Sequence, residues 1–111
     1  MSQPYVISVV LNTNHRDDTL QCLASLAQST YPNHKALVLD NASSDGSVAA
    51  IRAAFPADEI IELTENLGYA GNNNVGILAA ISQGADWVLV LNEDTILAPD
   101  CLARLVEVGE S

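Results

Sequence analysis

The chain has 111 residues, 49% of them hydrophobic and 5% aromatic, and its 14 Asp and Glu against 4 Lys and Arg give a formal net charge of −10. This length supports one domain with its own core, and the composition excludes a disordered chain. The acidic balance argues against nucleic acid or an anionic membrane as a direct partner. An anionic substrate would need a metal ion or backbone dipoles to offset repulsion.

Four short runs of mostly branched, apolar residues predict β-strands. Because the runs are nearly uninterrupted, they are typical of parallel strands that helices cover on both faces. The first run is too short for a signal peptide or a membrane-spanning segment, and no basic leader precedes it. The four predicted strands cover residues 6–11, 36–39, 60–63 and 87–91.

Apolar residues recur at helical spacing after each predicted strand. The spacing predicts helices over residues 20–27, 48–55 and 75–82, and a last one around residues 102–106 that begins near Pro99. Strand–helix alternation implies right-handed crossovers. We therefore expect an α/β fold, an open, mostly parallel Rossmann-like sheet of about four strands with helices on both faces. Because the chain stops near a helix end, we expect residues 1–111 to form one partial domain.

Two cysteines, Cys22 and Cys101, lie far apart within the helical patterns. We interpret them as reduced, buried thiols, because a zinc site would need clustered ligands. These features predict a cytoplasmic protein, and for a longer parent chain a place at the inner face of the membrane.

Polar residues gather in the four segments that follow the predicted strands. Since parallel strands end at one edge of a sheet, these segments should lie together, where open α/β sheets bind ligands. The opposite connections have ordinary turn sequences. This asymmetry predicts a binding site formed by NTNHR (residues 12–16), DNASSDGS (40–47), ENLGYAGNNNVG (65–76) and NEDT (92–95).

Two aspartates in the second segment have both structural and binding interpretations. Asp45, or its neighbour Ser44, is best explained as a cap of the helix that begins near Gly46. Asp40 closes the second strand before that helix starts. Its carboxylate could accept a hydrogen bond from the imide N–H of a uracil or thymine ring, or it could cap the turn, and the sequence leaves both open.

The third segment is only loosely similar to a phosphate-binding glycine loop. Gly68, Gly71 and Gly76 miss the G-x-G-x-x-G spacing, and the segment follows the third strand instead of the first. Small residues at the start of a helix still leave backbone N–H groups free to meet a diphosphate. The run of three asparagines, residues 72–74, supplies neutral amides where most phosphate sites have Arg or Lys.

The fourth segment places Glu93 and Asp94 where an apolar strand ends. A carboxylate in that position needs a partner, and no basic residue follows until Arg104. A divalent cation is therefore the expected partner of Asp94. Carboxylate and phosphate oxygens are hard ligands, so Mg²⁺ or Mn²⁺ fits better than zinc. A solvated acidic turn is the alternative.

Taken in order, VVLNTN, SLAQSTYPNHKALVLDNASSDGS, ENLGYAGNNNVG and VLVLNEDT resemble the nucleotide-binding half of family 2 glycosyltransferases, which have the GT-A fold. The resemblance runs from about Val6 to Leu105, and the wording is most similar to the rhamnosyltransferase-like branch. It implies that Asp40 pairs with the base and that Asn12, Thr13 and Asn14 line the nucleoside. It further implies contacts to the nucleotide from the other predicted site residues, with Asp94 as metal ligand: Gly71, Asn73, Asn74, Asn92 and Glu93.

Three residues depart from the common family pattern. Thr13 stands where many members have Tyr, Asn73 replaces a common Arg, and Asn92 replaces the first Asp of the D-x-D motif. The departures weaken stacking on the base and remove a positive contact, so they bear on donor affinity more than on nucleotide class.

The resemblance implies inverting transfer of a sugar from a UDP- or dTDP-sugar to a saccharide or lipid-linked acceptor, as in polysaccharide biosynthesis. The family's catalytic base lies in the second half of the fold, beyond Ser111, so no base is assigned here. A non-catalytic nucleotide-binding module is the alternative. A receiver-like phosphoacceptor domain is less favoured, because the first strand ends in Asn12 and the lysine of this chain, Lys35, precedes the second strand.

Overall fold

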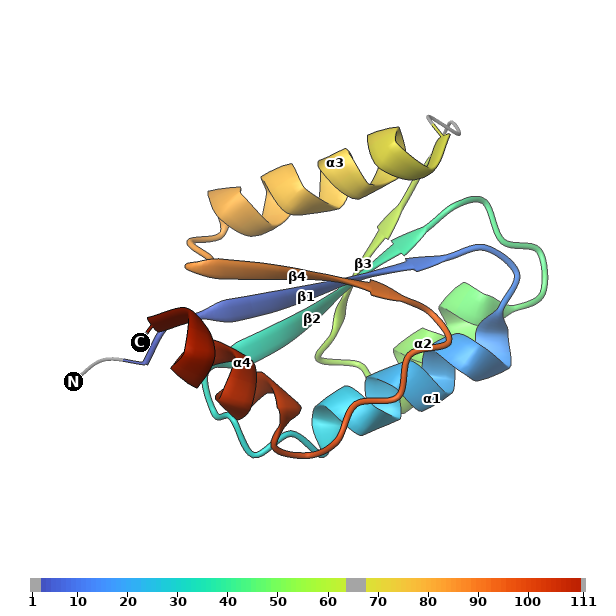
Figure 1. Cartoon of the computed structure of the whole chain (residues 1–111). Helices are drawn as coiled ribbons and strands as arrows, with labels where there is room; N and C mark the ends of the chain where they lie inside the picture. The colour runs from blue at the N-terminus through green and yellow to red at the C-terminus, as the bar shows by residue number, and fades with distance from the viewer. Residues whose placement is uncertain (1–2, 64–67, 111) are drawn as a thin grey trace.

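The fold alternates strand and helix four times along the chain (Figure 1). The computed structural model describes residues 3–63 and 68–110. All four predicted strands and all four predicted helices are present. The third strand and the second helix are each shifted by one residue toward the N-terminus, and the third helix begins seven residues before its predicted start at residue 75. The elements are β1 (Val6–Asn12), α1 (Arg16–Ala27), β2 (His34–Asp40), α2 (Ser47–Ala54), β3 (Glu59–Glu62), α3 (Gly68–Ser82), β4 (Trp87–Asn92) and α4 (Cys101–Glu110).

The four strands form one parallel sheet in the order β3-β2-β1-β4. Its register aligns the strand ends, because Asn12 lies opposite Asp40 and Leu11 lies opposite Asn92. The segments that follow the strands therefore leave the sheet at one edge. This alignment confirms the α/β class and the parallel arrangement expected from the sequence.

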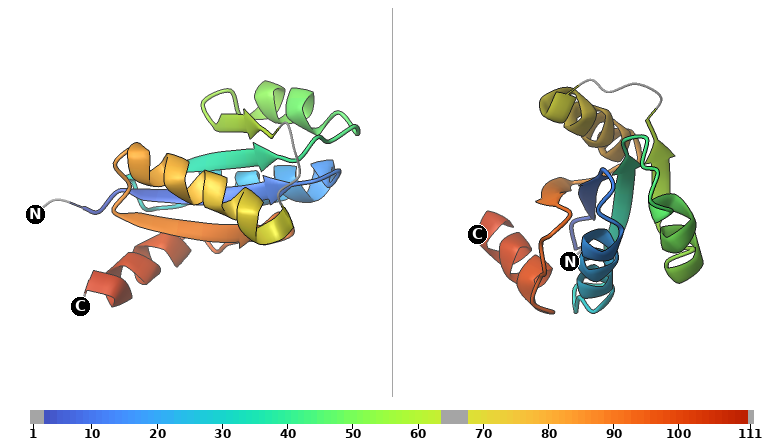
Figure 2. Two further views of the ribbon diagram at one scale, coloured as in Figure 1. Left: turned by 90° about the horizontal axis from the view of Figure 1, so that it is seen from above. Right: turned by 90° about the vertical axis from the view of Figure 1, so that its right-hand side faces the viewer.

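Helices cover both faces of the sheet, with α1, α2 and α4 on one face and α3 on the other (Figure 2). Helices α1, α2 and α4 lie side by side on the first face, where Leu23, Ile51 and Leu102 pack against the strands. Helix α3 lies on the second face and packs Ala80 against Ile7, Val9, Leu37 and Leu39. These strand residues are fully buried, as expected for central strands covered on both sides.

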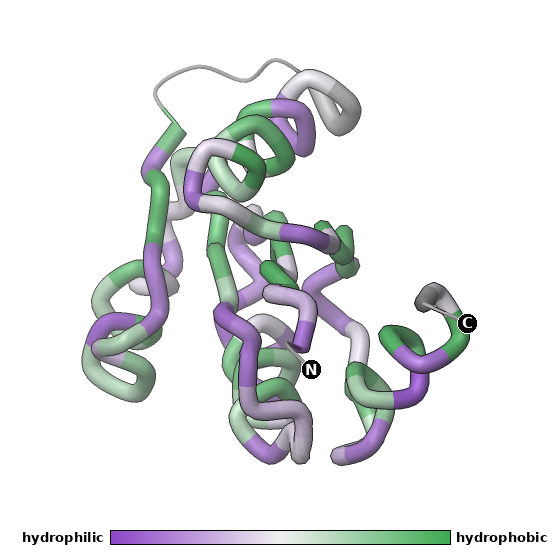
Figure 3. The backbone as a smooth tube through the Cα atoms, turned by 90° about the vertical axis from the view of Figure 1, so that its left-hand side faces the viewer, coloured by the Kyte–Doolittle hydropathy of each residue, from purple (hydrophilic) through white to green (hydrophobic). Residues whose placement is uncertain are grey.

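Helix α3 approaches the sheet closely at Gly76. A Cβ atom at this position would lie 2.6 Å from Val9 Cγ1 and 2.8 Å from Leu39 Cδ1, closer than carbon atoms pack. Figure 3 shows the hydrophilic residues near the start of α3 (purple) followed by hydrophobic turns (green). The close contact at Gly76 places these polar first turns beside the carboxyl ends of β1 and β2.

Within the described ranges, none of the helices combines the length and the apolar character needed to cross a bilayer. The carboxyl ends of β1, β2 and β4 and the start of α3 form one polar edge of the sheet, the rim, and the predicted site residues lie along it.

Candidate functional site

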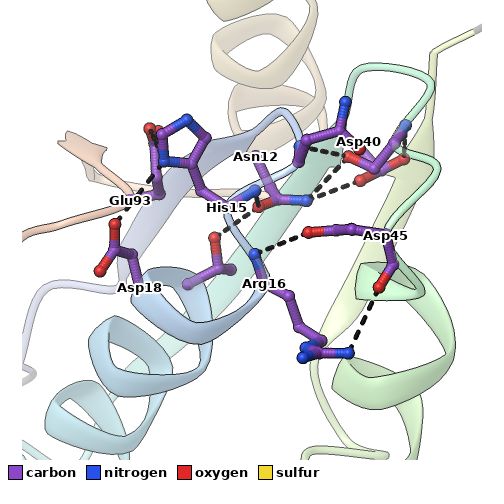
Figure 4. Close-up of polar contacts among 10 residues, drawn as sticks. Asn12, His15, Arg16, Asp18, Asp40, Asp45 and Glu93 are labelled. Carbon is purple, nitrogen blue, oxygen red and sulfur yellow. Dashed lines mark hydrogen bonds and ion pairs between the residues drawn. The ribbon is translucent and has the colours of Figure 1, made fainter.

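Asn12 is a fully buried hub between the first two polar segments (Figure 4). Its Nδ2 donates to Asp40 Oδ1 at 2.8 Å and to Ser43 Oγ at 3.0 Å. Its Oδ1 accepts from Thr19 Oγ1 at 2.7 Å and from the His15 backbone N–H at 3.3 Å. These four bonds use both N–H groups and the carbonyl oxygen. Contact between Asn12 and a nucleoside stays a prediction, and the observed role of its amide is to hold two loops together.

Asp40 is buried at the end of β2, with 2% of its surface exposed. Besides the bond from Asn12, its Oδ2 accepts from the Ser43 backbone N–H at 3.0 Å, which closes the turn after the strand. The turn-capping interpretation of Asp40 is therefore present in the structure. Since a carboxylate has about four lone-pair positions, two bonds leave capacity for a ligand N–H, and pairing with a base stays a prediction.

Asp45 caps the starts of two helices. Its Oδ1 accepts from the backbone N–H of Ser47, the first residue of α2, at 3.0 Å and also from the Ser47 hydroxyl. Its Oδ2 accepts from the backbone N–H of Arg16, the first residue of α1, at 3.1 Å. The hydrogen bond from the Ser47 side chain is the largest reason that the pKa of Asp45 lies below its usual value. The capping interpretation is thus confirmed, from one position before the N-cap Gly46.

Asn14 joins the same two loops from the outside. Its backbone N–H donates to Ser43 Oγ at 2.9 Å, and its Oδ1 accepts from the Ser44 backbone N–H at 2.7 Å. Asn14 adopts a left-handed φ of 53°, which asparagine tolerates better than most residues. The loops after β1 and β2 therefore form one connected unit.

The third polar segment enters the structure as the first turns of α3. The predicted start of this segment, residues 65–67, lies outside the described residues. Gly71, Asn73 and Asn74 are all helical, and Asn74 is exposed. Asn73 is 6% exposed, and its buried Oδ1 has no hydrogen-bond partner within the described part of the chain. An orphan buried acceptor requires an explanation, and a ligand N–H is one.

The fourth segment lies beside the start of α1. Glu93 Oε1 is 3.7 Å from His15 Nδ1, and the same nitrogen is 3.6 Å from Asp18 Oδ2 (Figure 4). Burial, reinforced by the carboxylates of Glu93 and Asp94, raises the pKa of the Cys22 thiol from 9.0 to about 11. These two carboxylates therefore lie close enough to α1 to disfavour ionisation of its buried thiol.

Asp94 is exposed and has no ion pair among the described residues. Each Lys and Arg has a different carboxylate partner: Arg16 pairs with Asp17, Lys35 with Glu59, Arg52 with Glu62 and Arg104 with Asp100. No guanidinium or ammonium group of the described residues therefore forms an ion pair with Asp94.

The carboxylates of the rim do not form a closed metal site. Over residues 3–63 and 68–110, no three His, Cys, Asp or Glu side chains are grouped to hold a metal ion. Mg²⁺ and Mn²⁺ sites in nucleotide-binding proteins commonly use one or two carboxylates and complete their coordination with phosphate and water oxygens. The unpaired Asp94 fits that arrangement, and it does not fit a zinc site.

The structure brings together the predicted residues of the first two segments through direct bonds, and those of the third and fourth through the shared sheet edge. Three residues that organise this edge had no predicted role: His15 and Ser43 lie within the predicted polar segments, and Thr19 lies outside them. Thr19 carried a usable signal, because it shares the buried face of α1 with Cys22, Leu23 and Leu26. A polar residue on such a face needs a buried partner, and the end of β1 supplies it.

The profile of one protein family, described as "Glycosyl transferase family 2", matches residues 5–110 of the chain. Among curated relatives, "Succinoglycan biosynthesis protein ExoO" of Rhizobium meliloti (strain 1021) is 31% identical over 109 residues, which is 97% of this chain and 30% of that protein. "Galactofuranosyltransferase GlfT1" of Mycobacterium tuberculosis is 34% identical over 91 residues, 80% of this chain and 30% of that protein.

Two solved structures extend the comparison. "Mannosyltransferase PcManGT from Pyrobaculum calidifontis in complex with GDP-Man and Mn2+" superposes with a TM-score of 0.86 at 27% identity, over 96% of this chain and 32% of that chain. The structure of S. aureus TarS in complex with UDP shares the fold, with a TM-score of 0.83 at 19% identity over 96% of this chain and 32% of that chain. The chain thus spans about a third of the length of these proteins.

Proposed function

The chain belongs to glycosyl transferase family 2, and on that premise we propose that it is the donor-binding part of an inverting, nucleotide-sugar-dependent glycosyltransferase. The donor is a UDP- or dTDP-sugar, and the acceptor is a saccharide or lipid-linked hydroxyl. Because the chain spans about a third of its relatives' length, we propose residues 1–111 as the donor half of a GT-A domain.

The connected loops after β1 and β2 support the proposed nucleoside position. Asp40 retains lone pairs for a base N–H, while Thr13 and Asn14 are exposed beside it at the rim. Asn12 then acts mainly by fixing Asp40, since its own amide is occupied by protein groups. Across the sheet edge, the orphan Oδ1 of Asn73 offers a further acceptor to the nucleotide.

The diphosphate is the group that this acidic rim must accommodate. The cationic side chains of the described residues all pair with carboxylates, so charge compensation would come from the start of α3 and from Mg²⁺ or Mn²⁺ on Asp94. A bound divalent ion supplies Lewis-acid stabilisation of the charge on the departing diphosphate. Asn92, exposed at the end of β4, would face the ribose.

In the proposed reaction an acceptor oxygen bonds to the anomeric carbon while the bond from that carbon to the diphosphate breaks. The electron pair goes to the diphosphate, and the proton of the acceptor goes to a general base. Glu93 is a poor candidate for the base, because its neighbour Asp94 lies on the leaving-group side. We propose that the base belongs to a part of the enzyme other than this chain.

The single observation that carries the proposal is an exposed Asp94, without a cationic partner among the described residues, at the edge where the loops meet. Isothermal titration of the chain with UDP and dTDP, with and without Mn²⁺, tests it. We expect binding that depends on Mn²⁺ and a loss of that dependence in Asp94→Asn. Asp100→Asn is the matched control, because Asp100 pairs with Arg104 and lies outside the rim.

Two results would count against the proposal. Absence of Mn²⁺-dependent heat with both nucleotides would refute the donor site. Equal loss of binding in Asp94→Asn and Asp100→Asn would show a general charge effect instead of a specific metal ligand. The chain could also bind nucleotide but transfer no sugar, even when it is joined to the remaining two thirds of a longer relative. That result would favour the non-catalytic nucleotide-binding module.

A further inference from the structure

His15 stands between two loops that the proposed donor site needs in a fixed relation. It is the residue before α1, and its backbone N–H is tied to the buried Asn12 while its carbonyl accepts from the Thr19 N–H at 2.9 Å. Its side chain makes no cap bond to the helix. The imidazole instead lies between the carboxylates of Asp18 and Glu93 (Figure 4).

The connection from β4 to α4 runs along α1 and is anchored at its far end. The Leu97 backbone N–H donates to Ser25 Oγ at 3.1 Å, and the Thr30 backbone N–H donates to the Pro99 carbonyl at 2.7 Å. Both anchors lie toward the end of α1, whereas Glu93 contacts His15 at its start. The contact of His15 with Glu93 therefore joins the near end of this connection to the Asn12 hub.

The surroundings explain why an imidazole suits this position. The carboxylates of Asp18 and Glu93 lie 3.6 and 3.7 Å from the imidazole of His15, and the guanidinium of Arg16, at the start of α1, pairs with Asp17 instead. The side chain of Glu93 is 26% exposed, against 53% for His15, so the carboxylate is the more confined partner. Without the imidazole, mutual repulsion would favour turning Glu93 away from Asp18 and moving the adjacent Asp94 with it.

We propose that His15 is a positioning residue, which holds Glu93 and so keeps Asp94 directed at the rim where the donor diphosphate binds. This inference rests on the proposed function, because it assigns His15 a role in binding a metal–nucleotide complex. His15 would act on the donor only through Glu93, and it lies in a different polar segment from Asp94.

A double-mutant cycle on nucleotide affinity tests the proposal. We expect His15→Ala and Glu93→Ala each to weaken binding of UDP in the presence of Mn²⁺ by roughly three- to five-fold, the range of one partly exposed polar contact. The double variant should bind UDP no more weakly than the single variant with the lower affinity, because both substitutions remove the same contact.

Asp18→Asn is the control, because Asp18 touches the same imidazole but lies on α1 and does not precede the metal ligand. Its affinity for UDP and Mn²⁺ should stay within two-fold of the wild type. Unaltered affinity in His15→Ala, or additive losses in the double variant, would overturn the positioning role. So would equal losses in Asp18→Asn and His15→Ala.

A second measurement separates this inference from the donor site itself. In the free protein, the backbone amide NMR signals of residues 92–95 should shift in His15→Ala, while those of residues 60–63 should not. If these signals do not move, the positioning role is wrong whatever the nucleotide result. If they move but the wild type binds neither UDP nor dTDP, the donor proposal fails and the contact stands as a fold-stabilising link.

Discussion

Replacing Asn12 by aspartate changes one atom type in the buried hub and leaves its shape intact. In the native chain, Nδ2 of Asn12 donates to Asp40 Oδ1 at 2.8 Å. In Asn12→Asp an oxygen would stand in place of that nitrogen, and two buried carboxylates would face each other. Two carboxylates at this distance cannot both stay ionised without a large penalty, so the pair is expected to retain one proton.

The size of the effect follows from that proton. Repulsion of two charges at this separation is about 6 kcal/mol at an effective dielectric constant near 20. Keeping one carboxyl protonated at pH 7, against a usual pKa near 4, costs about 4 kcal/mol. This is less than the repulsion between two ionised carboxylates, so the protonated pair is favoured. The folded variant then binds more protons than its unfolded chain. Its stability therefore falls as pH rises, by about 1.4 kcal/mol per unit.

Urea unfolding of both proteins from pH 5 to pH 8 measures this difference. Relative to the wild type, Asn12→Asp should lose about 1.5 kcal/mol at pH 5 and about 4 kcal/mol at pH 7. Asn14→Asp is the matched control, because Asn14 is exposed and its Oδ1 is already an acceptor. The interpretation of Asn12 as a buried hydrogen-bonding hub would be refuted by a loss of stability in Asn12→Asp that does not vary with pH. A loss no larger than that of Asn14→Asp would refute it as well.

Three further predictions concern packing, ionisation and backbone strain. Gly76→Ala should lower the free energy of unfolding by about 1–2 kcal/mol, because the clash with Val9 and Leu39 outweighs the gain in helix propensity; urea titration beside the exposed-site control Leu78→Ala checks this. In the wild type, stability should fall by roughly 3 kcal/mol between pH 9 and 11, because the folded chain keeps the Cys22 thiol protonated while the unfolded chain ionises it. Cys22→Ala should remove this loss, and the difference between the pH profiles of the two proteins measures it. Ala42→Gly should raise the free energy of unfolding by about 0.5–1 kcal/mol, because Ala42 adopts a φ of 52° that strains an L-residue; an unchanged urea midpoint would contradict the strain.

Sequence periodicity predicted the elements well because each depends on local spacing. The branched run in β1 and the spaced apolar residues of α1 need only their own neighbours to be recognised. The shared edge of the polar segments followed from parallel strands, which is a rule of topology and not of any particular side chain. The capping role of Asp45 was likewise local, since its partner Ser47 is two positions away.

The arrangement inside the site was less accessible from sequence. Asn12, at a strand end among polar residues, has the pattern of a ligand contact, yet its amide is occupied by residues up to 31 positions away. His15 gave no signal, because its partner Glu93 becomes a neighbour only when β4 pairs beside β1. Periodicity predicts which face a residue occupies, but it does not predict which of several polar groups on that face completes its hydrogen bonds.

The strand order has a consequence for how the chain assembles as it is synthesised. β1 emerges first but lies between β2 and β4, and the bond from Tyr5 N–H to Asp86 Oδ2 spans 81 positions, against 28 for the bond from Asn12 to Asp40. A nascent chain can therefore pair β1 with β2 early, while the other side of β1 waits for the last strand. During that interval an apolar strand edge is open to neighbouring polypeptides. We expect chains released from the ribosome before Trp87 to depend on chaperones and to aggregate in their absence.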